Sequence, residues 1–233
     1  MSERASSAEF IWTGDLSWRS GHKIDLTPRL QNAYQTAVDG LAEACFDVTG
    51  NKTVYVKRVP VGKHHLGAAH NADAFSLVLD RQSATNSRYN FGFLENVRVI
   101  AHELTHQERM KHVPFDKTLT ERLATEGLAI LAESLVHGML DPASITEVDR
   151  YLYTGSNYWK WKLCEFFTDV QDVTESTSRG GSFDVERSVY SKWFQNNYEG
   201  YGLGAWVVCL NYVEDEDFGR ILKKPTSELL DVL

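Results

Sequence analysis

Two histidines and a glutamate occupy the segment His102-Glu-Leu-Thr-His106, inside the apolar-periodic run of residues 96–110. On an α-helix, His102 and His106 are four positions apart and project from the same face, one turn apart. Two neutral imidazoles placed in this way can bind one Zn²⁺ at distances of about 2.0–2.1 Å. Glu103 would lie beside the first ligand, where its carboxylate can take a proton from a water on the metal. The segment therefore predicts a zinc site that activates water.

The residues around this segment help to separate a zinc site from a coincidence. The pattern fixes only three positions, so a surface helix could carry two histidines and a glutamate on its polar side by chance. The run also contains an apolar stripe, which indicates that one helix face packs on a core and the histidine face turns to a cleft. The stripe consists of Val97, Ile100, Ala101 and Leu104. Asn96 precedes it and is expected to cap the helix N-terminus.

Glu126 is the candidate for a third ligand, because a catalytic zinc site has three protein ligands and an open position for water. It lies in a second predicted helix, residues 118–139, and residues 107–125 leave room for a break and an antiparallel return. This helix is apolar nearly all round, and a carboxylate buried there is costly unless it is paired or bound to a metal. Gly127 follows, and is expected to permit a close approach. Glu126 could instead lie exposed at a helix edge, or pair with Arg122 four residues earlier.

Three motifs carry a resemblance to a known family. They are the HELTH segment at 102–106, Leu123-Ala-Thr-Glu-Gly-Leu-Ala129 on the following helix, and Gly200-Tyr-Gly-Leu-Gly204. Their order resembles that of the bacterial family of predicted zinc-dependent proteases, over residues 53–213. The wider pattern is similar to the gluzincins, of which thermolysin is the familiar member. The resemblance implies one Zn²⁺ per chain held by three ligands, which are His102, His106 and Glu126.

The resemblance also implies an activity, a zinc metalloendopeptidase-like hydrolase of the gluzincin type that acts on a peptide or protein. Glu103 would be its general base. Peptide hydrolysis needs a donor for the oxyanion, and the resemblance points to Tyr201 at a helix N-terminus, with Tyr198 as a rival. Tyr201 could instead simply pack beneath the helix end. Two further alternatives are a zinc-binding module that cleaves nothing and a helical domain in which HELTH is coincidental.

The chain departs from the thermolysin pattern at one position. There, a carboxylate one turn after the ligand glutamate orients a zinc-binding histidine, whereas this chain has Ile130. Such partners fix the tautomer and orientation of the imidazole, so another group must do this here. Glu133 or a backbone carbonyl could serve, although the sequence alone favours a solvated helix residue at Glu133.

Composition limits the class of protein. The chain has 233 residues, 42% hydrophobic and 24% charged, with a net charge of −8, and this suits a globular protein with a real core. It has no long basic run, which argues against nucleic-acid binding. The N-terminus lacks an apolar segment and no run approaches 18 apolar residues, so we expect no membrane segment and a cytoplasmic location. Three widely spaced cysteines suggest buried reduced thiols. Nothing in the composition indicates an oligomeric state.

The predicted fold is α+β and zincin-like. A small mixed sheet and the HExxH helix occupy residues 1–112, a mostly helical part occupies residues 113–233, and the two form a single domain. In zincins an edge strand beside the metal helix binds extended substrate through its backbone. Residues 74–80 are the candidate for this strand, although they could equally form a core strand.

The remaining elements follow from local signals. Thr27 and Pro28 predict a helix N-cap and first position, and residues 53–59 predict a strand. We expect a loop at residues 62–71 and a flexible loop at residues 174–182. Helices are expected at 144–154, 156–171, 183–194, 201–214 and after Pro225.

Overall fold

The computed structural model describes residues 6–13, 26–59, 66–80, 91–113, 118–140, 156–178, 183–196, 199–215 and 217–231. Strands and one long helix come first and helices follow, so the predicted α+β class is confirmed. The chain divides into two compact units, each described by itself. The first consists of Met1–His112 and Ala132–Pro142, and the second of Val113–Leu131 and Ala143–Leu233. Whether they form a single domain stays a prediction.

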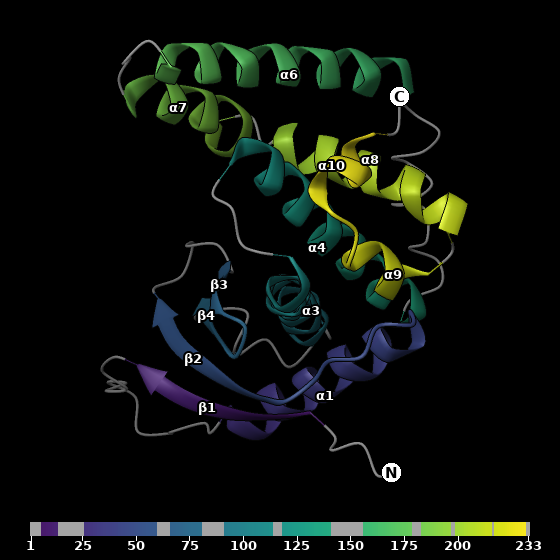
Figure 1. Cartoon of the computed structure of the whole chain (residues 1–233). Coiled ribbons are helices and arrows are strands. Elements are labelled where there is room, and N and C mark those ends of the chain that lie inside the picture. Colours follow the sequence, from purple (N-terminus) through teal and green to yellow (C-terminus); the bar gives the residue numbers. More distant parts are fainter. Residues whose placement is uncertain are drawn as a thin grey trace. The chain divides into compact units, whose positions relative to one another are not determined.

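The first unit contains a four-stranded mixed sheet in the order β1-β2-β4-β3 (Figure 1). β1 is parallel to β2, β2 is parallel to β4, and β3 runs antiparallel to β4. The strands are β1 (Ser7–Thr13), β2 (Asn51–Val59), β3 (Leu66–Asn71) and β4 (Ala74–Asp80). Residues 74–80 are a strand, as predicted, but β4 is paired on both sides. Of the two alternatives for residues 74–80, the edge strand is therefore wrong and the core strand is correct, because β3 lies at the edge.

The loop predicted over residues 62–71 is also wrong in its second half, where β3 lies. Leu66-Gly-Ala-Ala-His-Asn71 has no β-branched residue, so its local preference for a strand is weak. It is a strand because a short turn brings it back antiparallel to β4, where Gly67 lies opposite Leu77 and Ala69 opposite Phe75. Hydrogen bonding to β4 therefore outweighs the weak local propensity of residues 66–71 for a strand.

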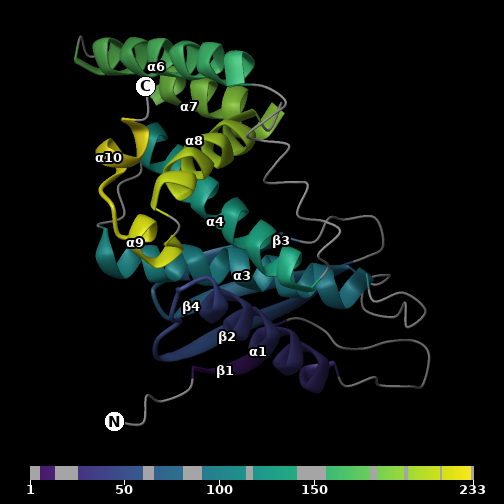
Figure 2. The same ribbon diagram turned by 90° about the vertical axis from the view of Figure 1, so that its right-hand side faces the viewer.

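Two helices of the first unit pack on each other beside the sheet, α1 (Thr27–Glu43) and α3 (Phe91–His112) (Figures 1 and 2). The N-cap of α1 is Leu26 rather than Thr27, and the Thr27 hydroxyl instead accepts a hydrogen bond from the Trp12 indole at 3.1 Å. α3 begins five residues before Asn96, so the predicted cap at Asn96 is wrong as well. The Asn96 side chain is buried within the helix.

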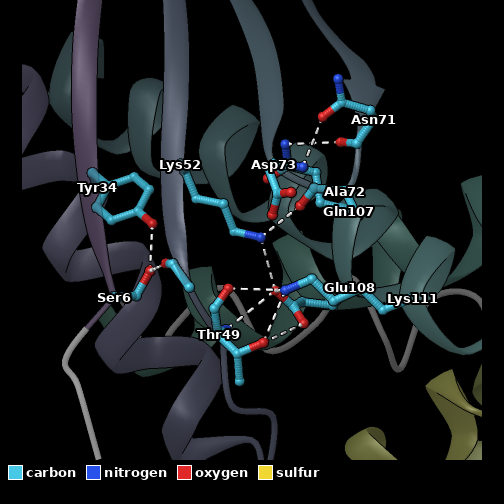
Figure 3. Close-up of polar contacts among 11 residues, drawn as sticks. Ser6, Tyr34, Thr49, Lys52, Asn71, Ala72, Asp73, Gln107, Glu108 and Lys111 are labelled. Atoms are coloured by element: carbon cyan, nitrogen blue, oxygen red, sulfur yellow. Dashed lines mark hydrogen bonds and ion pairs between the residues drawn. The ribbon is translucent and has the colours of Figure 1, made fainter.

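A buried polar cluster ties α3 to the sheet (Figure 3). Lys52 of β2 donates to Glu108 of α3 at 3.0 Å and to the Ala72 carbonyl, in the β3–β4 turn, at 2.7 Å. Lys111 also reaches Glu108, at 2.7 Å. Gln107, the residue after His106, donates to the Asn71 carbonyl at 3.1 Å. The residues that follow the histidines thus hold the end of β3 against their own helix.

Helix α4 (Leu119–Leu140) is continuous, and the division between the units passes along it. Its residues 119–131 belong to the second unit and its residues 132–140 to the first. The bounds of α4 confirm the helix predicted over residues 118–139. Glu126 and Glu133 lie on this one helix, two turns apart.

The second unit is helical in all of its described residues outside short connections. Its other elements are α6 (Ser156–Ser178), α7 (Phe183–Tyr190), the π-helical segment η2 (Ser191–Asn196), α8 (Glu199–Asp215), α9 (Phe218–Leu222) and α10 (Thr226–Leu230). The flexible loop predicted from residue 174 is wrong up to Ser178, which α6 includes, and α9 was not predicted. The helix predicted at 144–154 lies outside the described residues.

In the second unit, the backbones of α4 and α8 approach each other closely. A Cβ added at Gly127 would lie 2.9 Å from the Gly204 Cα and overlap the Gly204 carbonyl. One added at Gly204 would overlap the Leu123 carbonyl of α4 and lie 3.1 Å from the Gly127 Cα. Both positions therefore require glycine, which confirms the close approach predicted at Gly127. The buried apolar cluster of this unit includes residues of both helices, and its large members Trp193, Trp206 and Phe166 are all at most 1% exposed.

Two further expectations concern the cysteines and the membrane. Cys209 is buried, but Cys45 and Cys164 are exposed, so the prediction of three buried thiols is wrong for these two. In the part of the chain that the structure describes, no helix has both the length and the hydrophobicity needed to cross a bilayer.

Candidate metal centre

His102 and His106 project from the same face of α3, as their spacing predicts. Their Nε2 atoms face each other at 2.9 Å, and the ring centroids are 4.6 Å apart. Two nitrogens bound to one tetrahedral zinc ion at ordinary distances are about 3.3 Å apart. His106 is 8% exposed and His102 is half-buried. A small opening of the pair would therefore admit a metal ion.

Glu133 is the partner of His102. Its Oε1 lies 2.6 Å from His102 Nδ1, and its Oε2 accepts from Arg98 at 3.2 Å. This carboxylate favours the tautomer with the proton on Nδ1, which leaves the Nε2 lone pair for a metal. The expectation of a solvated helix residue at Glu133 is wrong. A sequence signal was present, since Glu133 follows Glu126 by two helical turns on nearly the same face.

Replacing Glu133 by alanine should weaken zinc binding by about 10- to 100-fold, because the His102 ring loses the group that fixes its orientation. Competition with a chromogenic chelator measures the affinity. Glu133→Gln keeps an acceptor oxygen and should lose less. Glu214→Ala removes an exposed carboxylate from α8 and serves as the control. Equal affinity in Glu133→Ala and Glu214→Ala would contradict this role of Glu133.

Glu103 is buried, at 3% exposure, beside the edge strand β3. A Cβ added at Gly67 of β3 would lie 2.6 Å from Cγ and Cδ of Glu103. A side chain at position 67 would therefore force the Glu103 carboxylate out of this position. No local pattern singles out Gly67, because its contact with Glu103 depends on the position of β3 at the sheet edge.

Glu126 is 3% exposed, so the alternative of an exposed residue at a helix edge is wrong. The other alternative is correct, because Arg122 Nη2 lies 2.8 Å from Glu126 Oε1. Pairing with arginine does not compete with metal binding, since a carboxylate has two oxygens and about four lone-pair sites. Ligation of a metal by Glu126 stays a prediction.

Tyr201 is the third residue of α8, near the helix N-terminus as predicted, and is half-buried. Burial and the nearby Glu126 charge raise its pKa, while a hydrogen bond from Arg122 acts in the opposite direction. The net shift is upward, so the phenol keeps its proton at neutral pH and can donate it to an acceptor. Its ring also packs edge-on to Phe194, with centroids 5.7 Å apart. The rival Tyr198 lies outside the described residues.

Among the described residues, His102, His106 and Glu126 form a group that could hold a metal ion. One ligand atom from each lies within 4.8 Å of the others. Two imidazole nitrogens and one carboxylate oxygen are a donor set that zinc uses in catalytic sites with an open fourth position. The residues present thus fit the metal that the sequence predicts.

Comparison with known proteins gives a fold and no family. No protein-family model matches the chain, and no curated protein matches it. A crystal structure of an aminopeptidase N family protein from Idiomarina loihiensis has a similar fold, with a TM-score of 0.57 and 14% sequence identity. The similarity covers 96% of this chain and 38% of that one, so this chain spans well under half of the neighbour's length. At such identity, the likeness concerns the fold alone.

Proposed function

We propose that this protein is a zinc-dependent peptidase of the gluzincin type. The observation that carries the proposal is the group of His102, His106 and Glu126, in which a metal ion could be held next to a buried glutamate, Glu103. The likeness to an aminopeptidase N family protein supports a peptidase-like function at the level of the fold.

Each residue has a role that its surroundings support. A zinc ion held by the three ligands would lower the pKa of a bound water towards neutrality and polarise the scissile carbonyl. Glu103 accepts the proton of the attacking water and passes it to the leaving amine. Tyr201, protonated at neutral pH, donates a hydrogen bond to the oxygen on which negative charge develops. Glu133 holds the His102 ring in place.

The edge strand β3 is the element that we expect to bind the substrate backbone. One side of β3 pairs with β4, and the other side has no paired strand within the described sheet. An extended peptide can add to such an edge through main-chain hydrogen bonds. Gly67 of β3 also lies against Glu103. A peptide paired with β3 would therefore run past the proposed general base.

Metal analysis combined with a peptide library tests the proposal. Protein purified without added metal should contain about one zinc per chain, as three protein ligands imply, and His102→Ala should lose it. The wild type should cleave library peptides, chelation should stop cleavage, and added zinc should restore it. The cleavage positions then show whether internal or terminal bonds are cut. A protein with bound zinc and no turnover would instead be a non-proteolytic zinc-binding module, and a protein without zinc would have neither function.

A further inference from the structure

Arg122 is a residue to which the proposed chemistry has given no role, and it contacts two residues that have one. Its Nη2 lies 2.8 Å from Oε1 of Glu126, the proposed third ligand. It also hydrogen-bonds the hydroxyl of Tyr201, the proposed oxyanion donor. One guanidinium thus joins a residue of α4 to a residue of α8.

The direction of these hydrogen bonds follows from the chemistry of arginine. A guanidinium has five N–H donors and no acceptor, so the Tyr201 oxygen must accept in its bond with Arg122. The phenolic hydrogen is then left to donate to a different acceptor, as an oxyanion donor must. On Glu126, the same guanidinium holds Oε1, which orients the plane of the carboxylate. Lysine cannot reproduce this, because its ammonium is a point donor and not a planar fork.

The surroundings hold Arg122 itself in place. It lies on the same helix as Glu126, one turn earlier, and its guanidinium carbon is 5.9 Å from the centre of the Tyr190 ring. The glycine contact between α4 and α8, at Gly127 and Gly204, fixes the distance that Arg122 has to bridge. The arginine is therefore held by its own helix, by an aromatic face and by the two groups that it binds.

We propose that Arg122 is a positioning residue that sets the orientation of Glu126 and Tyr201 together. The inference rests on the proposed function, because it assigns a role towards a metal ligand and an oxyanion donor. Arg122 touches neither the substrate nor the metal in this role. Its loss would loosen two groups at once, the ligand that helps to hold zinc and the donor that acts only in the transition state.

The test compares Arg122→Met and Arg122→Lys with the wild type and with Arg220→Gln. Methionine keeps an unbranched chain without donors, and lysine keeps the charge without the fork. Arg220 also pairs with a carboxylate, that of Asp215 at 3.3 Å, but its side chain is 68% exposed, so its variant is the matched control. Each purified protein is checked for folding by circular dichroism. Zinc affinity, the visible spectrum of the cobalt-substituted protein, and kcat and KM for a cleaved peptide are then measured.

We expect Arg122→Met to bind zinc about 10- to 100-fold more weakly, to show an altered cobalt spectrum, and to lose kcat while KM stays near the wild-type value. Arg122→Lys should recover part of these losses, and Arg220→Gln should match the wild type. If Arg122→Met does not fold, the same measurements on Arg122→Lys decide. Wild-type affinity, spectrum and kcat in a folded Arg122 variant would overturn the positioning role alone. A wild type that neither binds zinc nor cleaves peptides would overturn the proposed function and this role with it.

Discussion

Replacing Glu103 by glutamine should lower kcat/KM for peptide cleavage by about 10²- to 10⁴-fold, the usual contribution of a general base, and leave zinc bound. The amide has the size and shape of the carboxylate but cannot accept a proton at neutral pH. Size matters at this position, because Glu103 is 3% exposed and packs closely on Gly67. Glu103 is not one of the three proposed ligands, so the metal content should not change.

Two other changes separate the chemistry of Glu103 from its position. Glu103→Asp keeps the carboxylate but withdraws it by one methylene, and should also lose activity, since a base must lie within hydrogen-bond reach of the proton it takes. Glu95→Gln, at a half-buried position on the same helix, is the matched control and should keep wild-type activity. If Glu103→Gln cleaves peptides as fast as Glu95→Gln does, Glu103 is not the base.

The features predicted correctly from sequence depend on local geometry. The spacing of His102 and His106 places both side chains on one helix face in any α-helix. Burial of Glu126 follows from the apolar residues around it on α4. Its pairing with Arg122, which was expected from the sequence only as an alternative to metal binding, follows from the spacing of four. Gly127 indicated a close helix contact, which the structure places at Gly204.

The features missed depend on contacts between distant parts of the chain. The edge position of β3 is set by the order of strand pairing, which residues 66–71 do not encode locally. Glu133 meets His102 across 31 positions of sequence. The cap at Asn96 failed for a different reason. An amide side chain before an apolar stripe fits an N-cap, but the helix had already begun at Phe91 and buries Asn96 within it.

Breaking the buried ion pair between β2 and α3 should have the largest effect on stability. Lys52 and Glu108 have side-chain exposures of 0% and 3%. Glu108→Leu would leave the Lys52 ammonium in the interior with the Ala72 carbonyl as its remaining described partner. Removing one member of a buried pair in this way should lower the free energy of unfolding of the first unit by about 3–5 kcal/mol. Hydrogen exchange of amides in β2 and α3, measured at increasing urea concentration, gives the free energy of unfolding of this unit.

A double substitution tests whether the unpaired Lys52 ammonium causes the loss of stability in Glu108→Leu. Lys52→Met combined with Glu108→Leu removes both charges and should recover most of the lost stability, because apolar residues of similar volume often replace a buried pair without cost. Lys111→Met removes the more exposed partner of Glu108, 24% exposed, and should cost about 1 kcal/mol or less. If the double variant is no more stable than Glu108→Leu, the loss comes from packing rather than from the unpaired ammonium.

The pH dependence of the same pair has a definite sign. Burial alone would raise the pKa of Glu108, but the hydrogen bond from Lys111 and the charge of Lys52 outweigh it, and the net pKa lies below the ordinary value. A carboxyl with a lowered folded pKa binds fewer protons in the folded state than in the unfolded one. Its stabilisation is therefore complete above the unfolded pKa, about 4.3 for glutamate, and is lost as the pH falls through the folded value. Acid titration of stability should show this loss in the wild type and a smaller one in the double variant, which has no carboxylate at position 108.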